Sequence, residues 1–186
     1  MHYSLIDVVT DIVQNGAESG ADLVELCVNE VSSDKGEFSF TVKDNGKGMK
    51  EDELKIARDP FVCDGIKQSL LKHPERKVGL GLPFMIQTAE STGGGWKIES
   101  SGAASGTTVS AWFDLGNVDT PPIGDIPGMF RTALLFNGLK EVMIHRTVGG
   151  RSYQVRKTEL VDALGDLEDS KSLLLLDKYL RSLEQC

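Results

Sequence analysis

The chain has 186 residues, of which 40% are hydrophobic and 26% are charged, a balance typical of a folded protein with one substantial core or one domain with an appendage. Its net charge of -8 argues against nucleic acid or an anionic membrane surface as the main partner, because both would repel it. Its apolar runs fall short of the ~20 residues that a membrane span requires, and acids occupy the N-terminus where a targeting peptide would be basic. We therefore expect a cytoplasmic protein.

The cysteines point to no special chemistry. Cys27, Cys63 and Cys186 are widely spaced and form no Cys-x-x-Cys pair. Such an arrangement favours free thiols over a disulfide framework or a zinc site.

The first elements are predicted to be a helix and two strands. Residues 4–19 carry apolar side chains at helical spacing, with Ser4 as N-cap ahead of Asp7 and Gly20 as a stop. Alternation in 21–29 and 38–44 indicates two strands separated by a polar turn.

The second strand ends in Asp44, a charged residue whose side chain is expected on the buried side of the strand. Asp44 has the parity of Phe38, Phe40 and Val42, so its side chain is predicted to point toward the core. A buried charge without hydrogen-bond donors is costly, and this one is followed by the run Asn-Gly-Lys-Gly.

The middle of the chain reads as a charged segment followed by a helix and a strand pair. Within 50–77 only 51–57 is predicted to be helical. The sequence "VGLGLPFM" opens a helix through about Ala89, and 96–101 and 107–115 are predicted to pair as strands. Trp96 and Trp112 lie on these strands, where we expect core positions rather than a ligand platform.

The segment "GNVDTPPIGDIPG" is the best candidate for a boundary, because its prolines and glycines interrupt all periodicity. Beyond it we predict a helix over 129–137, a hairpin over 141–155 that turns on two glycines, and helices over 158–167 and 170–185. The last helix has one leucine stripe, which either packs onto its own domain or forms a partner or dimer surface. The stripe consists of Leu173, Leu176, Leu180 and Leu183.

Two local patterns are compatible with phosphate chemistry, although each is weak alone. The side chains of Asp11, Asn15 and Glu18 project from one face of the first helix. An ordinary solvated polar face would also explain this spacing. The "GLGLP" turn opens a helix, where backbone N–H groups can cradle phosphate, but it lacks the third glycine of a dinucleotide fingerprint and the Lys-Ser/Thr of a P-loop.

Taken together and in order, "DIVQNGAESGA", "VKDNGKGM", "VGLGLPFM" and "SGTTVSAWF" resemble the boxes of the GHKL ATPases, the superfamily of gyrase, the ninety-kilodalton heat-shock chaperone, sensor histidine kinases and MutL. The resemblance covers residues 1–116. It implies an α+β fold, the two-layer Bergerat sandwich, in which a mixed, mostly antiparallel sheet is covered by helices on one face. Residues 117–186 would be a small α/β extension of unassigned role.

The resemblance also implies roles for individual residues. Asp44 would accept a hydrogen bond from the adenine amino group, and Asn15 would offer an amide oxygen to Mg²⁺. Residues 50–78 would form a lid over ATP. The remaining cofactor-binding positions implied are Gly46, Gly48, Met49, Lys77, Gly79, Leu80, Gly81, Leu82 and Thr107.

Two departures from the family pattern limit what can be expected of catalysis. Hydrolysing members usually carry a glutamate as general base where this chain has Asp11, whose carboxylate is one methylene shorter. None of the three histidines resembles a phosphoacceptor histidine. Glu18 matches a position that is commonly acidic in gyrase-like members.

The sequence therefore predicts a magnesium-dependent ATP-binding protein that slowly hydrolyses ATP or transfers its phosphate to an unidentified acceptor. The alternative is a non-catalytic nucleotide sensor that binds a protein partner through residues 117–186. Whether the chain forms a homodimer stays open. A scaffold that binds no nucleotide would require the ordered boxes to be coincidence.

Overall fold

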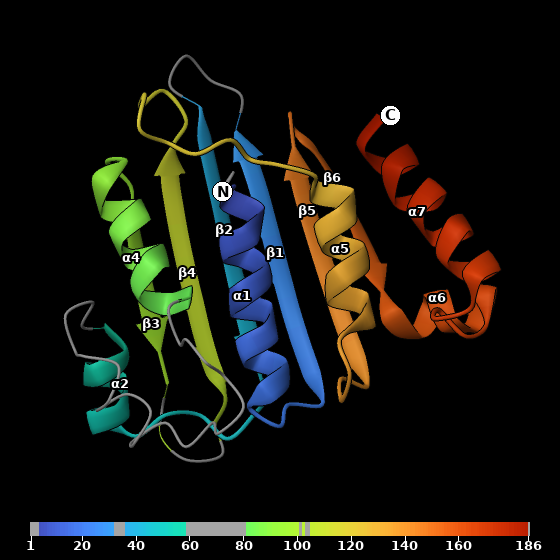
Figure 1. Cartoon of the computed structure of the whole chain (residues 1–186), viewed down its shortest axis with the longest axis horizontal. Coiled ribbons are helices and arrows are strands. Elements are labelled where there is room, and N and C mark those ends of the chain that lie inside the picture. The colour runs from blue at the N-terminus through green and yellow to red at the C-terminus, as the bar shows by residue number, and fades with distance from the viewer. Residues whose placement is uncertain (1–3, 32–35, 59–80, 101, 103–104, 186) are drawn as a thin grey trace.

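The computed structural model describes residues 4–31, 36–58, 81–100, 102 and 105–185. Helices cover one face of a six-stranded sheet with strand order β3-β4-β2-β1-β5-β6 (Figure 1). All neighbouring strands are antiparallel except β1 and β5, which are parallel. The predicted α+β sandwich with a mixed, mostly antiparallel sheet is confirmed.

The elements agree closely with the predicted ones. The strands are β1 (Leu23–Val31), β2 (Glu37–Asp44), β3 (Gly95–Glu99), β4 (Thr107–Asp114), β5 (Glu141–Val148) and β6 (Arg151–Arg156). The helices are α1 (Leu5–Glu18), α2 (Glu51–Arg58), α4 (Gly81–Ser91), α5 (Ile126–Leu135), α6 (Lys157–Leu164) and α7 (Ser170–Gln185).

Helix α1 lies across the middle of the sheet, between α4 and α5 (Figure 1). It begins where predicted, because the Ser4 backbone N–H donates to the Asp7 carboxylate at 2.8 Å. Its apolar stripe faces the sheet, and Leu5, Val9 and Val13 are fully buried. It ends at Glu18, and Gly20, which follows the C-cap residue Ser19, has a φ of 80° that suits glycine.

The C-terminal extension joins the same sheet. The register Leu26↔Ile144 places β5 beside β1, and β6 continues the sheet as the next strand. Helix α5 packs beside α1 and α7 packs beside α5. The first turn of α1 is tied to the segment before α5, since the Leu5 N–H donates to the Pro122 carbonyl at 2.9 Å. The extension thus shares both layers of the sandwich.

The leucine stripe of α7 packs onto its own fold. Leu176 and Leu180 are fully buried, and Leu183 is partly buried against the core. This supports self-packing, the simpler of the two interpretations of the stripe. Leu174, Leu175 and Tyr179 lie outside the stripe and are exposed.

One prediction about the tryptophans is wrong. Trp112 is 41% exposed, because alternation along β4 sends Val109, Ala111 and Phe113 to the helical side and Trp112 to the opposite one. Trp96 does pack against the core, and its indole N–H donates to Glu90 at 3.0 Å.

In the described part of the chain, no helix has the length and apolar character needed to cross a membrane.

Candidate functional site

The site begins with Asp44, the last residue of β2. Its side chain points to the helical face as predicted and is only 9% exposed. The Oδ1 atom accepts hydrogen bonds from the Gly46 N–H at 2.8 Å and the Ser19 hydroxyl at 3.2 Å. Burial raises the pKa of this carboxyl, while hydrogen bonds from Gly46, Ser19 and Thr107 act in the opposite direction. The donors offset part of the cost of burying an acid at this strand end, but burial remains the larger effect.

Glycines bring three backbone segments together around this carboxylate. A Cβ at Gly46 would lie 1.8 Å from the Ser19 hydroxyl oxygen, and one at Gly106 would lie 1.9 Å from the Asp44 carbonyl oxygen. Gly48 and Gly106 also have φ values of 67° and 70°, which favour glycine. The glycines of the "DNGKG" run are therefore required by the close packing as well as by conformation.

Hydrogen bonds join the loop that follows β2 to the residues between β3 and β4. The Gly106 N–H donates to the Gly46 carbonyl at 3.1 Å. The Ser100 hydroxyl accepts from the Met49 N–H at 2.8 Å and donates to the Gly106 carbonyl at 2.9 Å. Met49 and the start of β4 are thereby fixed beside Asp44, and Thr107 is the direct β-sheet partner of Asp44.

Helix α1 covers the site on the helical side of the sheet. A Cβ on Gly16 would lie 3.3 Å from the Asp44 Cβ, so α1 passes directly over the end of β2 at this point. Asn15 precedes Gly16, and both Asn15 and Asp11 are half-buried. Glu18 is held on the surface of α1, where its carboxylate accepts from the Gln14 amide at 2.8 Å.

The start of α4 meets α1 at Asp11. A Cβ on Gly81 would lie 3.1 Å from the Asp11 Cβ, which makes Gly81 the point of contact between the two helices. Leu82 is partly buried against the core. Asp11, Asn15, Gly81 and Asp44 thus come from three elements that meet on one side of the sheet. Lys77, Gly79 and Leu80, and the greater part of the expected lid, lie outside the described residues.

Three residues of this region had no assigned role in the sequence interpretation. Ser19 and Ser100 hold Asp44 and Met49, and Asn45 accepts from the backbone N–H groups of Asp22 and Leu23 at 2.9 and 3.0 Å. An Asn directly after a strand is a common turn residue, which could have indicated the role of Asn45. The two serines carry no such signal, because their partners are distant in the chain.

The side chains of this region include an oxygen ligand suited to a nucleotide-bound magnesium ion, the Asn15 amide. Among the described residues there is no cluster of three or more His, Cys, Asp or Glu side chains that could hold a metal. Mg²⁺ in nucleotide sites typically takes one or two protein oxygen ligands together with phosphates and waters. The Asn15 amide is an oxygen ligand of that kind.

Comparison with known families decides which class this arrangement belongs to. A model of the histidine kinase-, DNA gyrase B- and HSP90-like ATPases matches residues 3–117. The chain belongs to this family. Residues 3–117 are therefore a GHKL ATP-binding domain.

Individual GHKL relatives are more distant. The hybrid signal transduction protein dokA of Dictyostelium discoideum is 30% identical over 113 residues, which are 59% of this chain and 7% of dokA. The chain thus spans a small fraction of the length of this relative.

Solved structures are similar at low identity. The Aquifex aeolicus MutL ATPase domain complexed with ADP has 14% identity and a TM-score of 0.40, over 82% of this chain and 63% of that one. The N-terminal domain of a DNA repair protein has 15% identity and a TM-score of 0.43, over 82% and 51%. The histidine kinase domain of the Erythrobacter litoralis EL346 blue-light activated kinase has 21% identity and a TM-score of 0.28, over 50% and 33%.

Proposed function

We propose that the chain binds magnesium-ATP between α1, the end of β2 and the start of α4, and slowly hydrolyses it or transfers its γ-phosphate. The observation that carries this proposal is the buried Asp44 carboxylate, which accepts hydrogen bonds from the Gly46 N–H and the Ser19 hydroxyl where glycines let the backbone segments approach closely. GHKL membership gives this carboxylate its expected ligand, the adenine amino group.

Recognition of the base rests on hydrogen-bond polarity. An ionised carboxylate only accepts hydrogen bonds, so it suits the amino group of adenine and opposes the carbonyl that guanine presents at the same position. Gly46 and Gly48 let the loop after β2 pack closely against Ser19 and Gly102, and Met49 and Thr107 flank the same region. We assign these residues to the nucleoside end of the site.

The phosphates are assigned to the space near Asn15 and Gly81. Gly81 starts α4, where backbone N–H groups and the helix dipole favour negative charge. Lys77, Gly79, Leu80 and Leu82 are assigned to the phosphates by their place in the family box. Asn15 would supply one oxygen to Mg²⁺, and Asp11 would orient or deprotonate the attacking water.

The first experiment is a thermal-shift and γ-phosphate assay on the full chain. ATP with Mg²⁺ should raise the unfolding midpoint, because a ligand that binds only the folded state stabilises it. Asn15→Ala should remove the magnesium dependence of that shift, whereas Gln154→Ala on β6 should leave it unchanged. Equal ATP affinity with and without Mg²⁺ in the wild type and in Asn15→Ala would refute the role of Asn15.

A non-catalytic nucleotide sensor is the second candidate, and one observation favours it. Asn45 binds the Asp22 N–H, and the Asp22 carbonyl accepts from the Lys140 and Glu141 N–H groups, each at 2.9 Å. The adenine end of the site is thus connected to the start of β5 in the extension.

Asp11→Asn separates the two candidates. If ATP is bound and phosphate is released or transferred by the wild type but not by Asp11→Asn, the protein is an enzyme. Asp162→Asn on α6 is the matched control. If no turnover occurs with either protein while ATP still binds, the sensor interpretation is supported.

A further inference from the structure

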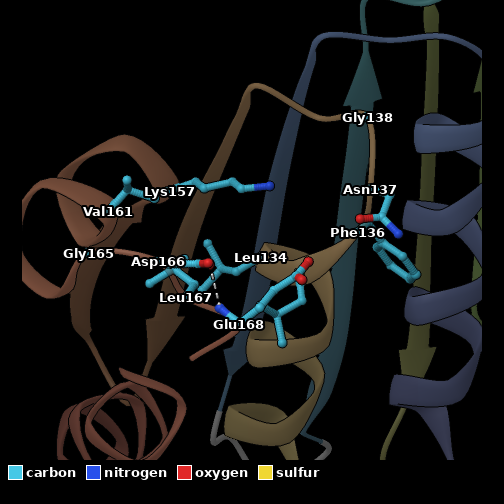
Figure 2. Close-up of a pocket in the computed structure, with 11 residues that line it drawn as sticks. Leu134, Phe136, Asn137, Gly138, Lys157, Val161, Gly165, Asp166, Leu167 and Glu168 are labelled. Atoms are coloured by element: carbon cyan, nitrogen blue, oxygen red, sulfur yellow. Dashed lines mark hydrogen bonds between the residues drawn. The ribbon is translucent and has the colours of Figure 1, made fainter. Parts of the chain in front are cut away.

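A pocket lies within the C-terminal extension, and none of the residues of the candidate ATP site lines it. It has a volume of about 520 Å³ and is formed by the end of α5, the turn that follows it, the start of α6 and the loop after α6 (Figure 2). Its walls are largely apolar, with Leu134, Phe136, Val161 and Leu167 among the lining residues. A concave apolar site with a few polar groups is typical of small-molecule binding.

Lys157 supplies the positive charge of this pocket. Its side chain is half-buried, and its ammonium group donates one hydrogen bond, to the Leu139 carbonyl at 3.0 Å. Burial lowers the pKa of Lys157, while the carboxylates of Glu168 and Glu141 act to raise it. An ammonium group can donate three hydrogen bonds, so Lys157 retains capacity for a ligand oxygen.

Glu168 supplies a negative charge to the same space. Figure 2 shows the Lys157 amine and the Glu168 carboxylate extending toward the same part of the pocket, with Asn137 on its other side. Among the described residues, Lys157 makes no ion pair within 4.0 Å of any carboxylate. The two opposite charges are near enough to influence one another but leave space between them.

The balance of charge in the lining disfavours a ligand with a single charge. A plain anion would meet one ammonium but also the carboxylates of Glu168 and Asp166, and a plain cation would meet Lys157. The end of α5 also lines the pocket, and the carbonyl end of a helix favours a positive group. A ligand with both charges and an apolar body satisfies all of these groups.

We propose that this pocket binds a free apolar α-amino acid. The ligand carboxylate pairs with Lys157, its ammonium group pairs with Glu168, and its side chain packs against the apolar wall. The inference stands on the extension alone and does not depend on ATP binding by the GHKL domain.

The test is a titration of the ¹⁵N-labelled full chain followed by NMR, with the amides of Gly138 and Gly165 as reporters because both glycines line the pocket. Three probes share one apolar body: L-leucine, 4-methylpentanoate, which lacks the amino group, and 3-methylbutylamine, which lacks the carboxylate. L-leucine should shift both amides with saturation, and each analogue should bind about tenfold more weakly, because one charged hydrogen bond is lost.

Two variants complete the test. Glu168→Gln changes an exposed side chain, so folding should be retained, and it should weaken L-leucine binding about tenfold. Lys157→Gln should have a similar effect, and Glu159→Gln, outside the pocket on α6, is the matched control. Absence of saturable shifts with L-leucine, equal binding of all three probes, or unchanged affinity in Glu168→Gln would each overturn the proposal.

Discussion

The buried Asp44 carboxylate has opposite effects on the stability of the free protein and on the binding of its expected ligand. Because burial raises the pKa of Asp44, the folded chain holds this proton more tightly than the unfolded chain does. The contribution of Asp44 to the stability of the nucleotide-free protein therefore falls as pH rises from the ordinary carboxyl value of 3.8 through the raised pKa of the folded state. We expect this carboxylate to destabilise the free protein at neutral pH and to be retained for its ligand.

Asp44→Asn should separate stability from binding. The amide oxygen can still accept from Gly46 and Ser19, so the fold should be kept. At pH 7 the unfolding midpoint without nucleotide should equal or exceed that of the wild type, and the excess should vanish near pH 4. ATP affinity, measured by calorimetry, should fall at least about tenfold. Wild-type affinity in this variant would contradict the adenine assignment.

Gly106 tests the close packing of the two loops. An alanine there would place its Cβ 1.9 Å from the Asp44 carbonyl oxygen, a backbone atom, at a φ of 70°. We expect Gly106→Ala to lower the free energy of unfolding by about 1–3 kcal/mol. Denaturant titration measures this change.

Gly149 provides the control, since it also has a positive φ but no atom within 4 Å of an added Cβ. Gly149→Ala therefore carries the conformational penalty without the collision. If both variants lose the same stability, the collision at Gly106 is relieved by a backbone shift and the packing argument is wrong.

At the scale of elements, α7 is attached to the sheet through one buried cation. The side chain of Arg146 on β5 is 1% exposed and pairs with Glu30 of β1 at 2.6 Å and with Glu184 of α7 at 3.2 Å. Tyr153 donates to the same Glu184 carboxylate. Burial would lower the pKa of Arg146, but the two glutamates outweigh it and raise the pKa above its ordinary value.

Removal of the Glu184 carboxylate should show how much the pairing with Arg146 contributes to stability. Glu184→Ala leaves Arg146 buried with one carboxylate, and we expect a loss of about 1–3 kcal/mol in the free energy of unfolding. Amide hydrogen exchange in the last turns of α7 should accelerate as well. Gln185→Ala, the exposed neighbour, should change neither quantity. Unaltered exchange in Glu184→Ala would show that the Arg146 pairing does not hold the last turns of α7, which the apolar contacts and the ion pairs of Asp177 and Arg181 would then hold.

The same elements show what could be predicted from sequence. Alternation with a period of two correctly placed Asp44 and the buried positions of β2. It could also have placed Arg146 inward with Val142 and Ile144, although a charged strand residue is ordinarily assigned to solvent. The partners of Arg146 are 116 and 38 residues away, so no local pattern identifies them.

In the candidate site, too, local patterns predicted residues within one motif but not partners that are distant in the chain. Gly46 and Met49 share one short motif with Asp44, and their role in the site stays a prediction, whereas no motif pointed to Ser100, whose partner Met49 is 51 residues distant. Trp112 was predicted to be in the core from its place on a strand, but its parity with Ser110 and Asp114 places it on the face away from the helices. Local periodicity therefore predicts direction within an element, and tertiary pairing supplies the contacts.

At the scale of the whole molecule, the extension is predicted to be necessary for folding of the ATP-binding domain. Without β5, strand β1 would become an edge, and without α5 the apolar side of α1 would lose a neighbour. A chain truncated after residue 117 should lose its near-ultraviolet circular dichroism and bind a hydrophobic dye. A truncated chain with native-like spectra and a cooperative transition would show that residues 1–117 fold independently.

The pairing of β1 with β5 also has a consequence for biosynthesis. Val24 lies beside Val142, so one side of β1 has no strand neighbour until most of the chain has been synthesised. At ribosomal rates of about 5–20 residues per second, that interval is on the order of ten seconds. During this time a nascent chain presents the unpaired backbone N–H and C=O groups of β1 in the middle of its future sheet, where another strand could pair with them.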